Sequence, residues 1–295
     1  MRRIESVRAP ALAIVLAIGA VAWLHAGADV ALPRAADSLK FAVIGDNGTG
    51  EPPQYEVARQ MVSSRSSFPF DFVLMLGDNM YGSQKPQDFV AKFERPYGPL
   101  LDAGIRFYAT LGNHDQPTNR SYAPFNMAGE RYYSFTRSPA QFFILDTNLM
   151  DRAQLAWIED GLGRAAEPWK IVYFHHPIYS DGDRHGSNVE MRVLLEPLLV
   201  RNGVSVVFSG HEHIYERTKP QKGITYFVEG SSGQLRKGGV TPSALTAASF
   251  ADDRTFMLIE ISGDQLFFQT ISRTGRMVDS GVIPRIGGAS ERSSQ

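Results

Sequence analysis

Five short polar motifs, each at the end of an apolar run, constrain this 295-residue chain more than any other feature. Each run has the length and composition of a buried strand, and four of the motifs begin with glycine. In open α/β sheets, ligands bind beyond the carboxyl ends of the strands, so we expect these loops to converge on one site. The motifs are Gly45-Asp46-Asn47-Gly48, Gly77-Asp78-Asn79-Met80-Tyr81, Gly112-Asn113-His114-Asp115, His175-His176-Pro177 and Gly210-His211-Glu212-His213.

Strand-like and helix-like segments alternate through the first three quarters of the chain. We predict helices near 55–64, from 151 and over 189–200, and four further strands after residue 222. This order predicts an α/β protein with two sheets packed between helices. The strands expected before residue 222 are 39–45, 71–77, 105–111, 140–146, 169–174 and 204–209, and those after it are 224–229, 256–262, 265–271 and 277–284.

The N-terminal 28 residues are typical of a targeting segment. Arg2, Arg3 and Arg8 precede an apolar run from Ala11 to Leu24, and small residues follow at 26–28. The run is shorter than the ~20 residues that span a bilayer comfortably, so a cleaved signal peptide is favoured over an uncleaved anchor. We therefore expect export to the periplasm or beyond, with a linker over 29–38, a catalytic domain over 39–286 and a flexible tail over 287–295.

Composition removes several classes of function. The 30 basic and 31 acidic residues nearly cancel, which argues against a nucleic-acid binder. Cysteine is absent, so disulfides, thiolate metal sites and cysteine nucleophiles are excluded together. Any metal must then be held by nitrogen and oxygen. Seven histidines are present; one lies in the targeting segment, five belong to the motifs, and His185 follows ten residues after His175.

Together the motifs resemble those of the calcineurin-like metallophosphoesterases, and in particular the small, tartrate-resistant type of purple acid phosphatase. The resemblance runs from about Leu39 to about Gly233. Most metallophosphoesterases carry a histidine where this chain has Gly48, and in the purple branch a tyrosine three residues after the second aspartate replaces it. Tyr81 occupies that place. The resemblance implies a four-layer α-β-β-α sandwich of two mixed sheets flanked by helices.

Two metal ions, ferric iron plus divalent iron, zinc or manganese, are implied by the same resemblance. Asp78 would bridge them, because a carboxylate has two oxygens with several lone pairs. The phenolate of Tyr81 would favour the trivalent ion, and imidazole and amide donors suit the divalent one. The first ion would be held by Asp46, Asp78, Tyr81 and His213, and the second by Asp78, Asn113, His175 and His211.

The reaction implied is attack of a metal-bound hydroxide on phosphorus, which hydrolyses phosphate monoesters at acidic pH. We predict that His114 and His185 bind phosphate oxygens and that one of them protonates the leaving alkoxide. The spacing from His175 to His185 is one residue longer than in the small type. The same metal site also suits a phosphodiesterase or a nucleotide pyrophosphate hydrolase, and a non-catalytic binder of metal or phosphate is a rival of another class.

Simpler interpretations exist for most of these residues. An aspartate after glycine often only closes a turn, Asn113 has the chemistry of a helix cap, and Tyr81 that of a half-buried aromatic residue. His176 is expected to pack in the interior or to hydrogen-bond around the site rather than bind a metal, because neighbouring side chains of a strand point to opposite faces. Asp115 and Glu212 either orient nearby imidazoles or are merely solvated. The stretch 234–254 is expected to be a mobile loop near the cleft.

The expected partner is a small phosphate ester. Membrane contact would require an uncleaved leader.

Overall fold

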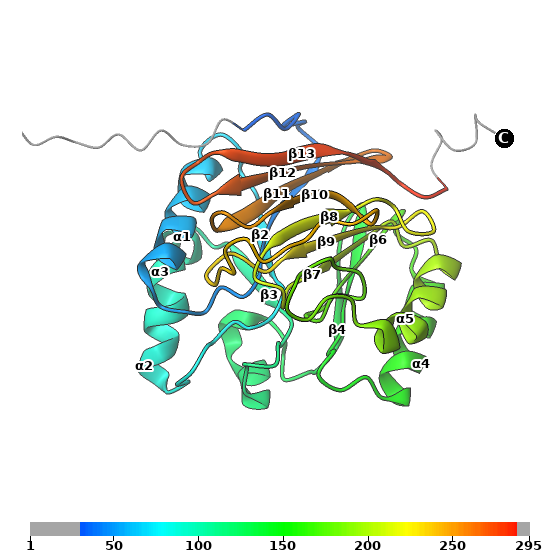
Figure 1. Ribbon diagram of the computed structural model, residues 1–295, viewed down its shortest axis with the longest axis horizontal. Coiled ribbons are helices and arrows are strands. Elements are labelled where there is room, and N and C mark those ends of the chain that lie inside the picture. Colours follow the sequence, from blue (N-terminus) through cyan, green and yellow to red (C-terminus); the bar gives the residue numbers. More distant parts are fainter. Residues whose placement is uncertain (1–29, 288–295) are drawn as a thin grey trace, which may run out of the picture.

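Two mixed β-sheets lie face to face between two groups of helices in the computed structural model, which describes residues 30–287 (Figure 1). A six-stranded sheet has the order β13-β12-β11-β1-β2-β3, and a seven-stranded sheet has the order β10-β8-β9-β7-β6-β5-β4. The expected four-layer sandwich is therefore confirmed. The strands are β1 (Leu39–Ile44), β2 (Phe72–Met75), β3 (Arg106–Ala109), β4 (Tyr133–Arg137), β5 (Ala140–Ile144), β6 (Trp169–Tyr173), β7 (Val206–Ser209), β8 (Tyr215–Thr218), β9 (Thr225–Glu229), β10 (Thr246–Phe250), β11 (Thr255–Ser262), β12 (Gln265–Ser272) and β13 (Met277–Pro284).

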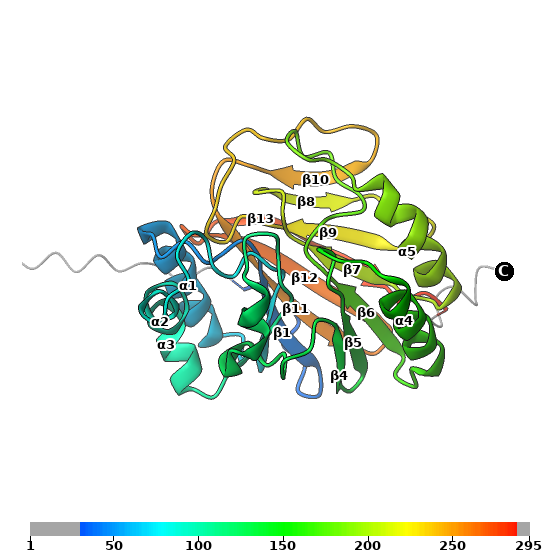
Figure 2. The ribbon, with the colours of Figure 1, turned by 90° about the horizontal axis from the view of Figure 1, so that it is seen from below.

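The helices cover the two outer faces of the sandwich. Helices α1 (Pro52–Arg65), α2 (Pro86–Phe89) and α3 (Arg95–Asp102) lie on the six-stranded side, with a π-helical stretch at Val90–Glu94 between the last two. Helices α4 (Arg152–Arg164) and α5 (Val189–Arg201) lie on the seven-stranded side (Figure 2). Two short 3₁₀ turns, Pro117–Ser121 and Ala123–Phe125, complete the described helical segments.

Strand β1 shows why the layers form. Its side chains alternate between two hydrophobic clusters, as the period of a strand requires. Phe41 and Val43 enter the cluster between the sheets, whereas Ala42 and Ile44 enter the cluster beneath α1 and α3. All four are fully buried. A strand whose residues 41–44 are all apolar needs cover on both faces, which the second sheet and the helices provide.

Strand direction sets the position of the polar loops. β1, β2 and β3 are mutually parallel, and so are β5, β6, β7 and β9. Their carboxyl ends therefore point to one edge of the sandwich. The predicted motifs follow five of these strands: β1, β2, β3, β6 and β7.

Most predicted elements match the structure within about three residues, but several regions differ. The sequence interpretation missed the helices between 86 and 102 and the short strands β4, β8 and β10. Residues 30–38, expected to be a linker, lie against the six-stranded sheet: Val30 and Leu32 are buried, and the backbone amides of Arg34 and Ala35 donate to Glu260.

The predicted leader (1–28) and most of the predicted tail (288–295) lie outside the described residues. Within residues 30–287, no helix combines the length and apolar character that a membrane span requires.

Candidate metal centre

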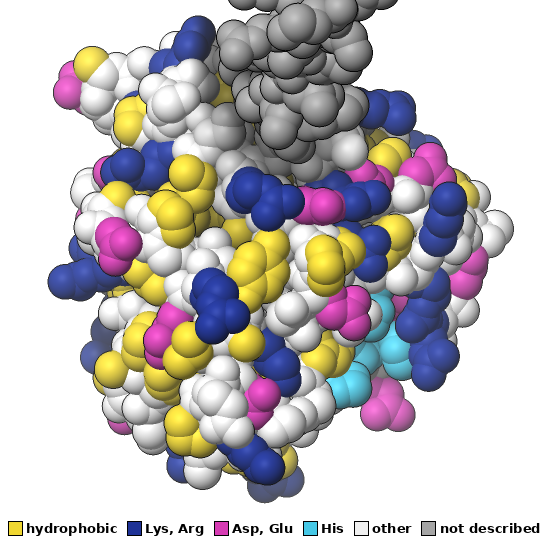
Figure 3. All heavy atoms as spheres, turned by 90° about the vertical axis from the view of Figure 1, so that its left-hand side faces the viewer, with side chains coloured by type: hydrophobic (Ala, Val, Ile, Leu, Met, Phe, Trp, Pro, Cys, Tyr) yellow, Lys and Arg dark blue, Asp and Glu magenta, His cyan; other side chains and the backbone are white. Residues whose placement is uncertain are grey.

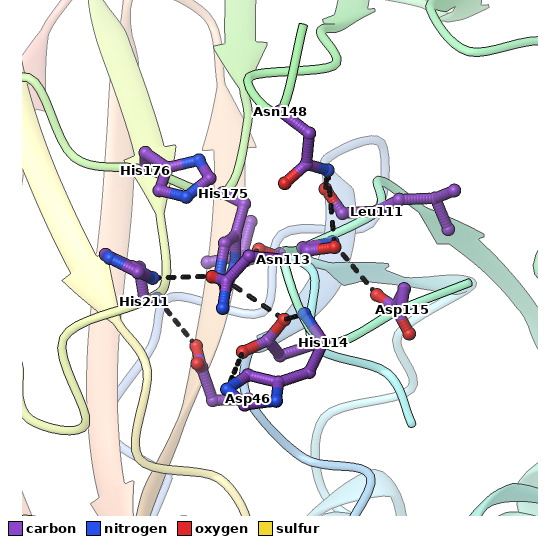
Figure 4. A network of polar contacts seen from close by, with 12 residues as sticks. Asp46, Leu111, Asn113, His114, Asp115, Asn148, His175, His176 and His211 are labelled. Carbon is purple, nitrogen blue, oxygen red and sulfur yellow. Dashed lines mark hydrogen bonds and ion pairs between the residues drawn. The ribbon is translucent and has the colours of Figure 1, made fainter. Parts of the chain in front are cut away.

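Donor side chains from five loops converge at the carboxyl edge of the two sheets. Figure 4 shows Asp46, Asn113 and His211 pointing toward one another, with the loop that carries Asn113 held by Asn148. The six-stranded sheet supplies the aspartates, Tyr81 and Asn113, and the seven-stranded sheet supplies three histidines. The seven predicted ligands, Asp46, Asp78, Tyr81, Asn113, His175, His211 and His213, all belong to this cluster.

One group of donors surrounds Asp46. The Tyr81 hydroxyl lies 2.9 Å from Asp46 Oδ1 and 3.1 Å from His213 Nε2. His213 Nε2 is 3.4 Å from the same Asp46 oxygen. Donor atoms of Asp46, Asp78 and His213 lie within 4.8 Å of one another, a spacing that one metal ion can occupy.

A second group surrounds His175. Its Nε2 is 3.1 Å from Asn113 Oδ1, 3.2 Å from His211 Nδ1 and 3.5 Å from Asp78 Oδ1. The Asp78 carboxylate thus lies between the two groups. This is the placement that a bridging ligand would require.

The chemistry of these donors fits a cation. His175 Nδ1 lies 2.9 Å from the carbonyl oxygen of Leu76, and donation of its proton there leaves a lone pair on Nε2. That lone pair faces amide, imidazole and carboxylate atoms that are electron-pair donors as well. Such a gathering is unfavourable without positive charge between the atoms, and oxygen and nitrogen donors of this mixture suit iron, zinc or manganese.

The pKa values of the donor side chains also indicate a site that favours positive charge. Burial by itself would lower the pKa of His175, but the carboxylates of Asp78 and Asp46 raise it to about 9. Burial and the neighbouring His175 and His176 lower the pKa of His211 to about 2, which keeps that ring neutral and able to bind a metal. Burial and both carboxylates raise the pKa of the Tyr81 phenol far above its usual value, so a phenolate here requires a strongly charged cation beside it.

The backbone at the ligands is held in an uncommon conformation. Asp46, Asp78 and His211 have φ of 52°, 51° and 71°, in the left-handed region that few side chains adopt. Of the four glycines that precede these motifs, Gly77 alone also has a positive φ, 93°. Strain of this kind is found where the surrounding structure fixes a functional group.

The preceding glycines are required for a different reason, close approach. A Cβ on Gly112 would lie 2.2 Å from Asp78 Oδ1, and one on Gly210 would lie 2.4 Å from Asp46 Oδ2. A Cβ on Gly45 would lie 2.2 Å from the carbonyl oxygen of Glu229. The loops therefore pack against one another so closely that no side chain fits between them.

His114 and His185 lie on the open side of the cluster. The His114 side chain is 51% exposed, its backbone amide donates to Asp78 Oδ1, and its Nε2 is 4.0 Å from Asp78 Oδ2. The His185 ring lies 4.1 Å from the His211 ring and lines an adjoining hollow with His176. Figure 3 shows histidine side chains gathered at one place on the surface. Both predicted substrate-binding histidines thus border the metal cluster from the solvent side.

A family profile described as Calcineurin-like phosphoesterase matches residues 39–215, more than half of the chain. This chain belongs to the calcineurin-like phosphoesterase family. Its relatives include mouse tartrate-resistant acid phosphatase type 5, which is 24% identical over 298 residues, with 84% of this chain and 91% of the relative covered. Purple acid phosphatase 17 of Arabidopsis thaliana is 26% identical over 242 residues, with 70% and 71% covered.

Solved structures support the same fold for this phosphoesterase. A purple acid phosphatase from yellow lupin seeds superimposes with a TM-score of 0.71 at 19% identity, covering 86% of this chain and 55% of the lupin chain. GAP50, described as the anchor in the inner membrane complex of Plasmodium, superimposes with a TM-score of 0.74 at 19% identity, covering 86% and 90%.

Two buried carboxylates of the phosphoesterase motifs hold backbone rather than imidazoles. Asp115 accepts hydrogen bonds from the backbone amides of Asn79, Met80 and Gly112 and so joins the second and third motif loops. Glu212 accepts from the amides of His185 and Gly186. The expectation that these acids orient neighbouring rings is therefore wrong; they fix the loops that carry the rings.

His176 lies closer to the centre than the sequence interpretation placed it. Its ring is 4.4 Å from the His211 ring, and its donor atom lies within 4.8 Å of those of His175 and His211. The alternation argument failed because β6 ends at Tyr173, so residues 175 and 176 are in a loop. His176 Nδ1 lies 2.9 Å from the Thr147 hydroxyl, and burial and His175 lower its pKa to about 4.

Proposed function

We propose that this phosphoesterase hydrolyses phosphate monoesters. The observation that carries the proposal is the convergence of seven nitrogen and oxygen donors in two groups that share Asp78, with His114 and His185 on the solvent side. A simple metal store needs no such pair of free imidazoles beside the ions. The relatives named as acid phosphatases support the same reaction class.

Each group of donors would hold one metal ion. Asp46, Asp78, Tyr81 and His213 would bind the first, and Asp78, Asn113, His175 and His211 the second. When bound, two such ions withdraw charge from phosphoryl oxygens and lower the pKa of water. We assign ferric iron to the first group, because a phenol as firmly protonated as that of Tyr81 ionises only beside a highly charged ion. Divalent iron, zinc or manganese fits the second.

The remaining work falls to the two histidines. In hydrolysis the oxygen of water bonds to phosphorus, the ester P–O bond breaks, and the leaving alkoxide takes up a proton. His114 and His185 are placed to donate hydrogen bonds to phosphoryl oxygens, and one of them to supply that proton. Burial lowers the pKa of His185 below its usual value, so its protonated fraction rises only in acid. This favours an acidic optimum.

Export is part of the proposal. The leader features at residues 1–28 favour a periplasmic or secreted enzyme, with a small phosphate ester as its partner and no nucleic acid. Membrane attachment would then depend on whether that segment is retained.

The test is hydrolysis of 4-nitrophenyl phosphate against bis(4-nitrophenyl) phosphate by the protein from residue 29, loaded with iron and zinc, over a pH series. We expect monoester turnover to dominate with an optimum in acid. Asp78→Asn should lower kcat at least about a thousandfold, because bound metal stabilises the transition state by several kcal/mol. Asp160→Asn, on the outer helix α4, is the matched control. Preference for the diester would overturn the monoesterase assignment, and activity equal to wild type in Asp78→Asn would overturn the metal assignment.

A further inference from the structure

An open cavity of about 620 Å³ adjoins the metal cluster and is lined by Asp183, Arg184, His185 and Arg236. His185 forms the wall between the two, because its ring also lies 4.1 Å from the ring of His211. A molecule whose phosphate occupied the metal cluster would therefore extend past His185 into this cavity. Figure 3 shows lysine and arginine side chains beside the surface histidines.

Backbone bonds on both sides fix the position of Arg184. The amide of Asp183 donates to the carbonyl of Gly239 at 3.0 Å, and the amide of His185 donates to the buried carboxylate of Glu212. Arg184 thus sits on a short segment pinned to two other loops. Its placement beside the metal cluster is built into the fold.

Arg236 is held from the opposite wall. Its backbone amide donates to the carbonyl of the metal-ligand candidate His213 at 2.9 Å, and its carbonyl accepts from Gly239 at 2.9 Å. The side chain lies over Gly239, where an added Cβ would approach Arg236 Cγ to 2.5 Å. Gly239 therefore provides the space through which this arginine reaches the cavity.

In the described part of the chain, neither of these two arginines forms an ion pair. Within residues 30–287, neither guanidinium has a carboxylate within ion-pair distance or a side-chain hydrogen bond, whereas Arg217 and Arg273 each pair with aspartate. Asp183 also lines the cavity, so one carboxylate faces two guanidinium groups there.

We propose that Arg184 and Arg236 bind a second phosphate group on the substrate, so that the preferred esters carry two phosphates. The inference rests on the proposed hydrolysis and deepens it. Guanidinium groups present a planar fork of donors that matches phosphate oxygens. The first phosphate is released from the ester at the metal cluster, and the second stays on the alcohol product.

Kinetics on a matched pair of substrates test this directly. The probes are propyl phosphate and the alkanediol bisphosphates of two to six carbons. We expect kcat/KM for the best bisphosphate to exceed that for propyl phosphate about tenfold or more, because charge-assisted hydrogen bonds to phosphate are strong. The double variant Arg184→Gln/Arg236→Gln should reduce this ratio to about two, the statistical advantage of two equivalent phosphates. Arg106→Gln/Arg164→Gln removes the same charge at distant exposed sites and should leave the ratio at the wild-type value.

Binding separates the arginine site from catalysis. Alkanediyl bisphosphonates cannot be hydrolysed, and calorimetry compares them with methylphosphonate on the metal-loaded protein. If the arginine site exists, a bisphosphonate should bind about tenfold more tightly than methylphosphonate, and the double variant should lose this difference. That result would support the site even if no ester were hydrolysed. Absence of hydrolysis would then overturn only the proposed function. The opposite result is hydrolysis of monoesters by the wild type with a bisphosphate-to-monophosphate ratio of kcat/KM of only about two, together with equal affinity for both phosphonate classes. That result would overturn the arginine site and leave the proposed function standing.

Discussion

At the scale of residues, the donor loops of this phosphoesterase pack closely because glycines at their contacts have no Cβ atom. Gly112 is the sharpest case, because a methyl group there would lie 2.2 Å from Asp78 Oδ1. We predict that Gly112→Ala lowers kcat/KM for an aryl phosphate at least about a hundredfold, since a shift of about 1 Å in a catalytic group has that effect. Metal content measured by atomic absorption should fall with it.

Gly98→Ala is the control for that experiment. Gly98 lies inside α3 with no atom within 4 Å of an added Cβ, so alanine fits. The variant should keep full activity and gain about 0.5–1 kcal/mol of stability from its better helix propensity. Normal metal content in Gly112→Ala would show that the loops have more room than the structure gives them.

Tyr81 offers a spectroscopic test of the metal assignment. Phenolate bound to ferric iron absorbs visible light, and Tyr81 is the phenol that touches both Asp46 and His213. The iron-loaded wild type should therefore be coloured and Tyr81→Phe should lose the band. Loss of a group that hydrogen-bonds to a metal ligand already lowers metal affinity about 10–100-fold. Removal of a direct ligand should therefore lower the affinity at least as much. Tyr132→Phe should keep the band; a band that survives in Tyr81→Phe would assign the colour to another group.

At the scale of elements, the N-cap residue of α5 stabilises a helix that begins next to the site. Asn188 accepts from the amide of Met191 at 2.9 Å and begins the helix directly after the loop that carries His185. Asn188→Ala should destabilise the fold by about 1 kcal/mol. For a domain of this size, that lowers Tm by about 2–4 °C in a calorimetric scan. Asn188→Ser retains a capping oxygen and should recover most of the loss, and equal effects of alanine and serine would contradict the cap.

The elements also show what the sequence could and could not predict. Runs such as 41–44 are apolar at every position, so their burial in a sandwich followed from composition, and glycine-led motifs located the donor loops. Strand β4 was missed because it alternates half-buried and exposed residues at a sheet edge. The helices between 86 and 102 contain Pro96, Gly98 and Pro99, residues that normally end helices.

For the site too, the sequence predicted what depends on residue type and spacing, and it could not predict contacts between loops that are distant in the chain. Residue types and spacing indicated side chains that the structure brings together, because metal coordination restricts which side chains serve. The roles of Glu212 and Arg236 were not predictable, since each depends on a loop distant in sequence: Glu212 on the loop of His185, Arg236 on the segment of Asp183. Spacing alone carries no information about such contacts.

At the scale of the whole molecule, one buried acid joins the two sheets beside the metal centre. Glu229 ends β9 and is fully buried, and it accepts from the hydroxyl of Thr255 at the start of β11 in the other sheet. Ser231 and Ser232 donate to it at 3.5 and 3.4 Å. Burial raises the pKa of Glu229 to about 8, since these hydroxyl groups do not replace the water that the charge would lose.

This raised pKa predicts how stability changes with pH. The folded protein holds a proton that the unfolded chain releases near the ordinary glutamate value, so the contribution of Glu229 to stability is present in acid and is lost as pH rises to about 8. Glu229→Gln keeps the shape without the titration. Its unfolding free energy relative to wild type, measured in urea at pH 5 to 8 with equal metal loading, should therefore increase with pH, by up to about 1.4 kcal/mol per unit. Parallel curves would mean that Glu229 stays charged and that the join between the sheets tolerates a buried carboxylate. An enzyme proposed to work in acid would then be most stable in the pH range where it works, because Glu229 is neutral there at the contact between the two sheets.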